Sequence, residues 1–150
     1  MAEEVSSLVT DNLWQANIRD YPKNQLVKVA DSYSPQSLIN EKASVDRFTL
    51  WVKDLLIGTI GLHKTPFDNR IPSHYVFGVF VRISHHSQGI GQSLTKYIEN
   101  YAFNLRIRKL VTSSSITARD FYLKYGYEPD NDGDDFNSTN NTYTLAKWLI

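Results

Sequence analysis

The stretch that decides the fold reads Val81-Arg82-Ile83-Ser84-His85-His86-Ser87-Gln88-Gly89-Ile90-Gly91-Gln92-Ser93-Leu94, and it joins two apolar patterns of different period. Upstream, residues 75–81 are aromatic and β-branched, which is typical of a buried strand. Downstream, apolar residues recur every three or four positions, as they do on the buried face of a helix. These are Ile90, Leu94, Ile98, Tyr101, Ala102 and Leu105. The sequence therefore predicts that a strand ends here, that a polar loop follows, and that a helix begins.

A loop at such a junction can bind an anion. The first backbone N–H groups of a helix have no intrahelical partner, and the positive end of the helix dipole points the same way. Gly89 and Gly91 lack the β-carbons that would keep a phosphate away from these amides. A Gly-x-Gly pair on its own more often marks only a turn and a helix start. The phosphate-binding interpretation therefore needs support from other parts of the chain.

The composition favours a single domain that covers residues 1–150. The chain has no cysteine, which excludes disulfides, thiolate metal sites and a cysteine nucleophile. Sixteen basic residues balance sixteen acidic ones without forming a basic stripe, so we expect no nucleic acid partner. The acidic start and the lack of a long apolar run predict a soluble, cytoplasmic protein without a membrane partner.

The remaining sequence predicts strands and helices in a mixed α/β order. Two strand-like runs, 48–52 and 55–62, are separated only by Lys53 and Asp54, which predicts a tight antiparallel hairpin. The other expected elements are a short strand near 6–10, helical stretches near 13–19 and 25–32, a turn near 35–40, a strand over 108–114 and a last strand over 142–149. The acidic, asparagine-rich segment 129–141 indicates a surface loop.

A short helix is expected between the last two strands. Thr117 and Asp120 have the spacing of a capping box, in which side chains bond the free amides at a helix start. Gly126 suits the left-handed conformation that commonly ends a helix. The helix would therefore run through Phe121, Tyr122 and Leu123.

Two separated motifs resemble the GNAT superfamily of N-acetyltransferases. The first motif of that family is an apolar strand, a loop of the form Arg/Gln-x-x-Gly-x-Gly/Ala and a helix, and here it reads His86-Ser87-Gln88-Gly89-Ile90-Gly91. The second is Ala-x-x-Phe-Tyr-x-x-x-Gly-Phe, and here it reads Ala118-Arg119-Asp120-Phe121-Tyr122-Leu123-Lys124-Tyr125-Gly126-Tyr127. The likeness covers residues 48–129. It is supported by the spacing of the two motifs, which are one helix and one strand apart.

Two positions depart from the family pattern. His86 stands where Arg or Gln is usual, and this change should weaken a phosphate site only modestly, because main-chain amides hold the phosphates. Ser113 and Ser115 stand where members often carry asparagine, and this change bears on the amide contacts to pantetheine.

The resemblance implies an acetyl-CoA-dependent N-acetyltransferase with a mixed, mostly antiparallel central sheet that is flanked by helices on both faces. In this family the enzyme holds acetyl-CoA and a primary amine together, so that the amine attacks the thioester directly. The pantetheine arm would lie as a false strand beside Phe80 and Val81, one of whose N–H groups would meet the developing oxyanion. The residues expected to contact acetyl-CoA are Phe80, Val81, His86, Ser87, Gln88, Gly89, Ile90, Gly91, Gln92, Ser115, Ala118 and Tyr122.

The resemblance also assigns catalytic roles. Tyr122 occupies the usual position of the general acid, and a phenol is protonated at neutral pH, as a donor to the leaving CoA thiolate must be. The alternative for Tyr122 is a core tyrosine with its hydroxyl on a carbonyl. His74 is the best titratable candidate for a base, although an ordinary loop histidine, with water as the base, remains the alternative. The adjacent histidines at 85 and 86 lack a third ligand, so we expect no metal.

The acceptor side stays open at the level of the sequence. Four aspartates, Asp130, Asp132, Asp134 and Asp135, could attract a cationic small-molecule or peptide amine, or could belong to a loop that is merely solvated. The exposed aromatics expected on the last strand leave a monomer and a homodimer both possible. Two other functions compete with catalysis, namely a non-catalytic acyl-CoA-binding or regulatory module on the same fold and a purely structural α/β domain.

Overall fold

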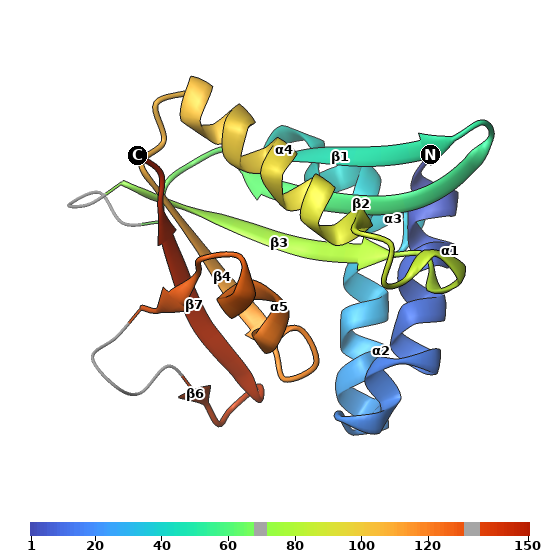
Figure 1. Ribbon diagram of the computed structural model, residues 1–150. Coiled ribbons are helices and arrows are strands. Elements are labelled where there is room, and N and C mark those ends of the chain that lie inside the picture. Colours follow the sequence, from blue (N-terminus) through green and yellow to red (C-terminus); the bar gives the residue numbers. More distant parts are fainter. Residues whose placement is uncertain (68–71, 131–135) are drawn as a thin grey trace.

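Residues 1–67, 72–130 and 136–150 are described by the computed structural model, and within them lie seven strands and five α-helices (Figure 1). The strands are β1 (Val45–Val52), β2 (Leu55–His63), β3 (Ser73–Val81), β4 (Lys109–Ser115), β5 (Glu128–Pro129), β6 (Phe136–Asn137) and β7 (Thr142–Trp148). The helices are α1 (Ala2–Gln15), α2 (Lys23–Ser32), α3 (Pro35–Asn40), α4 (Ile90–Asn104) and α5 (Arg119–Lys124). Short 3-10 turns cover 17–19, 41–43 and 83–85.

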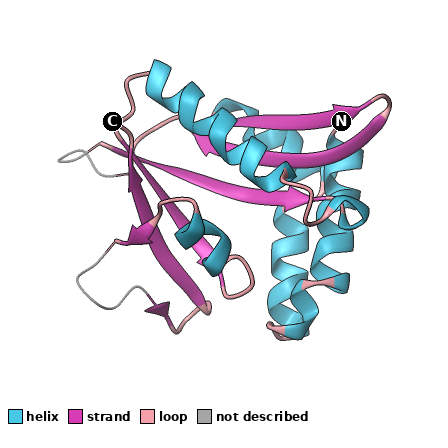
Figure 2. Cartoon of the chain, in the orientation of Figure 1, coloured by secondary structure: helices cyan, strands magenta, loops and turns pink. Residues whose placement is uncertain are grey.

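The strands form one sheet in the order β1-β2-β3-β4-β7-β5, and β6 also pairs with β7. β3 and β4 are parallel, and the other neighbours are antiparallel. Helices cover both faces, with α4 and α5 packed on one face and α1–α3 on the other (Figures 1 and 2). This arrangement confirms the predicted mixed, mostly antiparallel sheet with helices on both faces.

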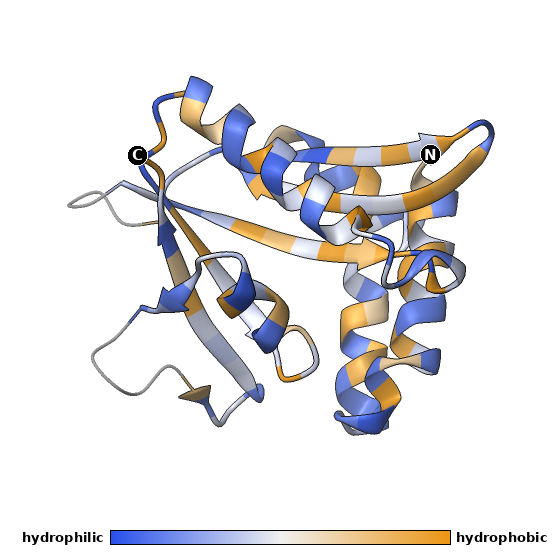
Figure 3. Cartoon of the chain, in the orientation of Figure 1, coloured by the Kyte–Doolittle hydropathy of each residue, from blue (hydrophilic) through white to orange (hydrophobic). Residues whose placement is uncertain are grey.

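Helix α1 replaces the short strand expected near residues 6–10. Val5, Leu8, Val9 and Leu13 are all buried, and they lie three to four residues apart on one side of the helix. Figure 3 shows the resulting mixture of hydrophobic and hydrophilic residues along α1 and α2. The strand prediction was wrong because the β propensity of a few residues yields to an apolar stripe that is buried along the whole helix.

The hairpin and the last strand agree with the sequence prediction. Lys53 and Asp54 alone connect β1 to β2, and Val52 pairs with Leu55 across the turn. Lys53 has a positive φ of 53°, as a tight hairpin turn between twisted strands requires. β7 pairs along its whole length with β4, and it lies between β4 and β5 in the sheet.

Helix α5 ends as predicted but does not begin as predicted. Gly126 has a φ of 93° just beyond the helix, which confirms its role as a left-handed stop. The capping box is absent, because the Thr117 hydroxyl donates to Asp20 Oδ2 at 2.5 Å instead. The start of α5 is held by Ser115, whose Oγ accepts the Ala118 N–H at 3.0 Å.

The position of the site follows from the parting of β3 and β4. These strands pair only where 73–75 of β3 face 109–111 of β4, and their later residues diverge (Figure 1). Gly78 marks a bulge in β3, since Thr59 pairs with Phe80 while Gly61 pairs with Phe77, so that β3 carries one residue more than β2. The carboxyl ends of β3 and β4 therefore leave an opening in the middle of the sheet.

Candidate functional site

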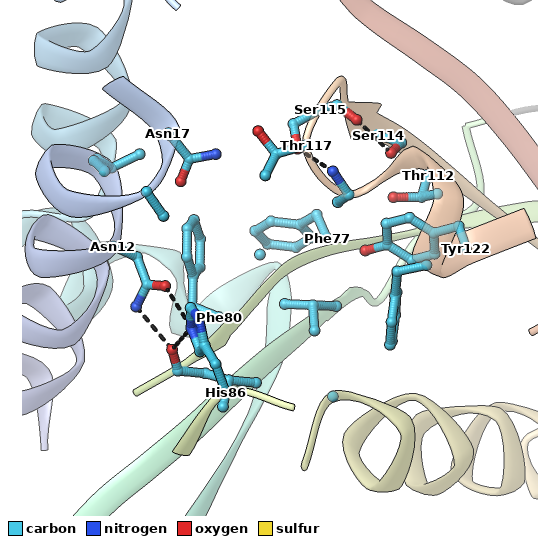
Figure 4. A pocket seen from close by; sticks show the side chains of 18 of the residues that line it. Asn12, Asn17, Phe77, Phe80, His86, Thr112, Ser114, Ser115, Thr117 and Tyr122 are labelled. Atoms are coloured by element: carbon cyan, nitrogen blue, oxygen red, sulfur yellow. Dashed lines mark hydrogen bonds between the residues drawn. The ribbon is translucent and has the colours of Figure 1, made fainter. Parts of the chain in front are cut away.

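A cavity of about 720 Å³ lies in the opening between β3 and β4 (Figure 4). Its walls come from α1, α2, β3, the start of α4, β4 and α5. All the residues predicted from the sequence to contact acetyl-CoA line this cavity except Gln88, which is exposed on the loop. The candidate base His74 does not line the cavity.

The start of α4 gives the cavity a cluster of backbone donors. Gly89 precedes the helix with a φ of 78°, and no side chain caps the first turn. A β-carbon built on Gly89 would meet no atom within 4 Å, so the space beside Gly89 is open. Gly91 is closely packed, because a β-carbon there would lie 3.2 Å from the Phe121 ring. The loop thus has the open, positively polarised amides that a phosphate group requires.

The imidazole of His86 forms hydrogen bonds with other residues of the chain. It was expected to contact acetyl-CoA. Its Nε2 lies 2.7 Å from the Val81 carbonyl oxygen and 3.2 Å from Asn12 Oδ1. Since a carbonyl oxygen only accepts, Nε2 carries the proton and donates. Asn12 of α1, itself buried, also donates from Nδ2 to the Val81 carbonyl at 3.0 Å. His86 therefore links α1 to the end of β3 and fixes the loop.

At the end of β3, the backbone groups on the side away from β2 face the cavity. The Arg82 N–H bonds the Ile57 carbonyl of β2 at 2.8 Å, and the Val81 carbonyl is bonded on the other side by His86. Backbone groups of successive residues in a strand point in alternate directions. The Val81 N–H is therefore directed away from β2, whereas the Phe80 N–H is directed towards it.

Tyr122 of α5 points its hydroxyl into the cavity beside Thr112 of β4 (Figure 4). The side chain is 4% exposed, and its ring packs edge-on against Phe121 and Tyr127. Burial raises the pKa of the Tyr122 phenol to about 12, an effect that a hydrogen bond with Thr112 partly offsets. The phenol is therefore protonated at neutral pH, so its hydroxyl has a proton to donate.

His74 lies near the beginning of β3, away from these groups. It is buried, it pairs in the sheet with Leu110, and its Nδ1 lies 2.9 Å from the His63 carbonyl. Six residues of strand separate it from Phe80, which corresponds to about 20 Å. His74 does not line the cavity into which Tyr122 points its hydroxyl.

The cavity also has an aromatic wall that was not predicted from the sequence. Tyr33, which directly follows α2, packs edge-on against Phe80 with ring centroids 5.4 Å apart, and Phe77 lines the same cavity. The guanidinium of Arg47 lies 5.3 Å from the ring centroids of both Tyr33 and Phe77. One signal could have revealed this contact, because a glycine inside a strand-like run often marks a close approach, and a β-carbon on Gly78 would lie 2.2 Å from the Tyr33 hydroxyl.

The cavity lining carries little formal charge. None of its described residues is Asp, Glu, Lys or Arg. Of the four aspartates considered for the acceptor, Asp130 is paired with Lys109 at 2.8 Å, and Asp132, Asp134 and Asp135 lie outside the described residues. Within the described part of the chain, no three His, Asp or Glu side chains are grouped as metal ligands would be. No described helix is both long and apolar enough to cross a bilayer.

Solved structures share this fold. The PaiA N-acetyltransferase of Thermoplasma acidophilum in complex with coenzyme A has a TM-score of 0.82 at 15% identity, over 98% of this chain and 92% of that one. An aminoglycoside 6'-N-acetyltransferase complexed with coenzyme A has a TM-score of 0.71 at 16% identity, over 99% and 91%. Tetrahymena GCN5 has a TM-score of 0.68 at 13% identity, over 99% and 86%.

The family of the chain is shown by a comparison of its sequence with family models. A comparison with curated proteins gave no match to this chain. Residues 17–143, most of the sequence, match the family model of the acetyltransferase (GNAT) domain. That match includes the loop before α4, the diverging strands and α5, which together form the cavity. The chain therefore belongs to the GNAT acetyltransferase family.

Proposed function

We propose that the protein transfers an acetyl group from acetyl-CoA to a primary amine by direct attack within a ternary complex. The observation that carries this proposal is the convergence of three features on one cavity, namely the open amides of α4, the free edge of β3 and the Tyr122 hydroxyl. Family membership supports acetyl transfer in general. The primary amine acceptor and the direct attack are what the resemblance to the N-acetyltransferases implies, and the residues of the cavity suit both.

The donor half of the site is suited to coenzyme A. The amides of Ser87, Gly89, Ile90 and Gly91 would hold the pyrophosphate, because they lie at the positive end of a helix and no side chain caps them. The edge of β3 that β4 leaves unpaired would bond the amide groups of the pantetheine arm. Ser115 and Ala118 line the cavity on the opposite side and would enclose the arm.

The reacting carbonyl would lie at the end of β3. The Val81 N–H is the one directed towards the cavity, so we assign it to the developing oxyanion, and Phe80 then contributes its ring to the aromatic wall. His86 and Asn12 hold the Val81 carbonyl, which fixes the direction of the peptide groups nearby. These two residues position the strand end and do not touch the reacting atoms.

Tyr122 would complete the transfer as general acid. As the amine nitrogen forms its bond to the acetyl carbon, the carbon–sulfur bond breaks and its electron pair goes to sulfur. The Tyr122 hydroxyl gives its proton to this thiolate and regains a proton from solvent. The nitrogen loses its extra proton to water, since no described residue that lines the cavity is a carboxylate.

Calorimetry and thiol release together test this function. We expect acetyl-CoA to bind at one site, and a thiol reagent to detect coenzyme A only when acetyl-CoA and a primary amine are both present. Binding without thiol release from a panel of primary amines would favour a non-catalytic CoA-binding module. Absence of binding at millimolar acetyl-CoA would show that the glycines of the loop serve only the fold.

A further inference from the structure

Two distant parts of the chain meet at the end of the cavity opposite the phosphate loop. The Tyr21 hydroxyl, between α1 and α2, accepts the Ile116 N–H at 2.7 Å and donates to the Asn141 carbonyl at 2.8 Å. One hydroxyl therefore joins the N-terminal helices both to the loop after β4 and to the turn before β7. Tyr21 is 8% exposed, so these bonds are shielded from water.

Two flanking contacts make the same connection. Gln25 Nε2 donates to the Asn140 carbonyl at 2.6 Å, one residue from the Tyr21 contact on that turn. The Thr117 hydroxyl donates to Asp20 Oδ2 at 2.5 Å, next to the Ile116 contact. We refer to these contacts of Asp20, Tyr21 and Gln25 as the Tyr21 bridge.

The bridge spans the cavity. Asn17, Tyr21 and Gln25 line it from the helical side, and Ser115, Thr117 and Thr142 line it from the side of the sheet. Figure 4 shows Asn17 and Thr117 facing one another at the end away from His86 and the start of α4. Acetyl-CoA that enters beside α4 would reach inward from the other end. The end that is spanned by the bridge is therefore left for the acceptor.

The size and lining of this region favour a small acceptor. The whole cavity of about 720 Å³ has the volume of a site for one drug-sized ligand, and the pantetheine arm would occupy part of it. The aromatic side chains of Tyr33, Phe77 and Phe80 line the same cavity and carry no formal charge. A polypeptide would have to cross the bridge in order to place a lysine amine at the thioester.

We propose that the Tyr21 bridge closes the acceptor end of the cavity and limits the acceptors to small-molecule amines, excluding amines carried by a polypeptide. This inference rests on the proposed acetyl transfer and specifies its substrate class. Tyr21 acts as a specificity-determining residue, because its hydroxyl holds the two sides of the acceptor end together.

The test compares two acceptors in three proteins. The acceptors are 2-phenylethylamine and a hexapeptide with one lysine, and the proteins are the wild type, Tyr21→Phe and the control Tyr97→Phe. Tyr97 is 56% exposed on α4 and lies outside the cavity, so its replacement removes a tyrosine hydroxyl without touching the bridge. In the wild type we expect kcat/KM for the small amine to exceed that for the peptide by about a hundredfold or more.

Tyr21→Phe should reduce this preference about tenfold, chiefly by lowering KM for the peptide, while Tyr97→Phe leaves it unchanged. The affinity for acetyl-CoA, measured by calorimetry, should be the same in all three proteins. If Tyr21→Phe folds poorly, Gln25→Ala serves as a second variant, because Gln25 is only half-buried and the same change in preference is expected.

Hydrogen exchange at the Ile116 amide gives a readout that does not depend on activity. This amide should exchange slowly in the wild type and faster in Tyr21→Phe. A wild type that acetylates the peptide as efficiently as the small amine, or a preference that Tyr21→Phe leaves unchanged, would overturn the inference. A third outcome is that no coenzyme A is released with either acceptor, although acetyl-CoA binds and the Ile116 amide exchanges slowly. In that case the proposed acetyl transfer is wrong, and the acceptor assignment is wrong with it.

Discussion

The two ends of the cavity are built in different ways. The donor end is formed mainly by one segment of the chain, residues 80–92, and its binding groups belong mainly to the main chain. The acceptor end is held by side chains that join residues 95 to 120 positions apart in the sequence. A main-chain site made of consecutive residues tolerates side-chain replacement, whereas a side-chain bridge depends on single hydroxyl and amide groups. We therefore expect substitutions to affect the two ends differently.

The largest effect is expected at Tyr122, where the two ends meet. Tyr122→Phe removes the proton donor to the leaving thiolate and keeps the ring in the core, so kcat should fall about a hundredfold or more. Affinity for acetyl-CoA should hardly change, because the α4 amides are untouched. Steady-state kinetics together with calorimetry measure both quantities. An unchanged kcat would leave Tyr122 as a core residue with no part in the chemistry.

Tyr122 also predicts a loss of stability at alkaline pH. Its phenol pKa is about 12 in the folded chain and about 10 in the unfolded chain, so the unfolded chain releases its proton first as pH rises. This contribution to stability is complete below pH 10 and is lost between pH 10 and about 12, on the order of 3 kcal/mol in total.

Urea unfolding of the wild type and of Tyr122→Phe, from about pH 8 to about pH 11, measures this effect. The other tyrosines are shared by both proteins and largely cancel in the comparison, apart from the small part of the Tyr127 pKa shift that Tyr122 causes. The free energy of unfolding of the wild type should fall relative to the variant above pH 10. A difference between the two proteins that stays constant with pH would contradict the burial of this phenol.

At the donor end, the conformation of the loop should matter more than its side chains. Gly89→Val places a β-branched residue at a φ of 78°, which costs roughly 1–2 kcal/mol and should shift the loop, raising the acetyl-CoA dissociation constant about tenfold. Ser87→Gly is the matched control, because Ser87 already has a φ of 62° and loses only its side chain. Its affinity should stay within about twofold of the wild type. Equal losses in both variants, measured by calorimetry, would argue against binding by main-chain amides.

The smallest effect is expected at His86, which links α1 to the end of β3 through Asn12 and the Val81 carbonyl. His86→Ala removes one of the donors to the Val81 carbonyl and should weaken acetyl-CoA binding about fivefold, as expected for the loss of roughly one hydrogen bond. His86→Gln keeps an N–H at a similar reach and should restore most of the affinity. If alanine and glutamine cause equally large losses in calorimetric titrations, the imidazole itself contacts the phosphates.

The same contrast explains which features could be predicted from the sequence. The β3–loop–α4 junction and the end of α5 at Gly126 depend on local conformation, and both are visible in the sequence. The Tyr21 bridge is not visible, because nothing near Tyr21 indicates that its hydroxyl bonds residues 116 and 141. The failed capping box has a related cause, since Thr117 bonds Asp20 across the fold in preference to its own helix.

The central claim is that one cavity holds acetyl-CoA and a small amine at the same time, and initial rates test it most directly. The two substrates are varied together, and double-reciprocal plots are drawn at several fixed concentrations of 2-phenylethylamine. Direct transfer in a ternary complex predicts lines that intersect, and a chain that carries no acetyl group after incubation with acetyl-CoA alone. Parallel lines, together with a covalently acetylated chain, would contradict the account.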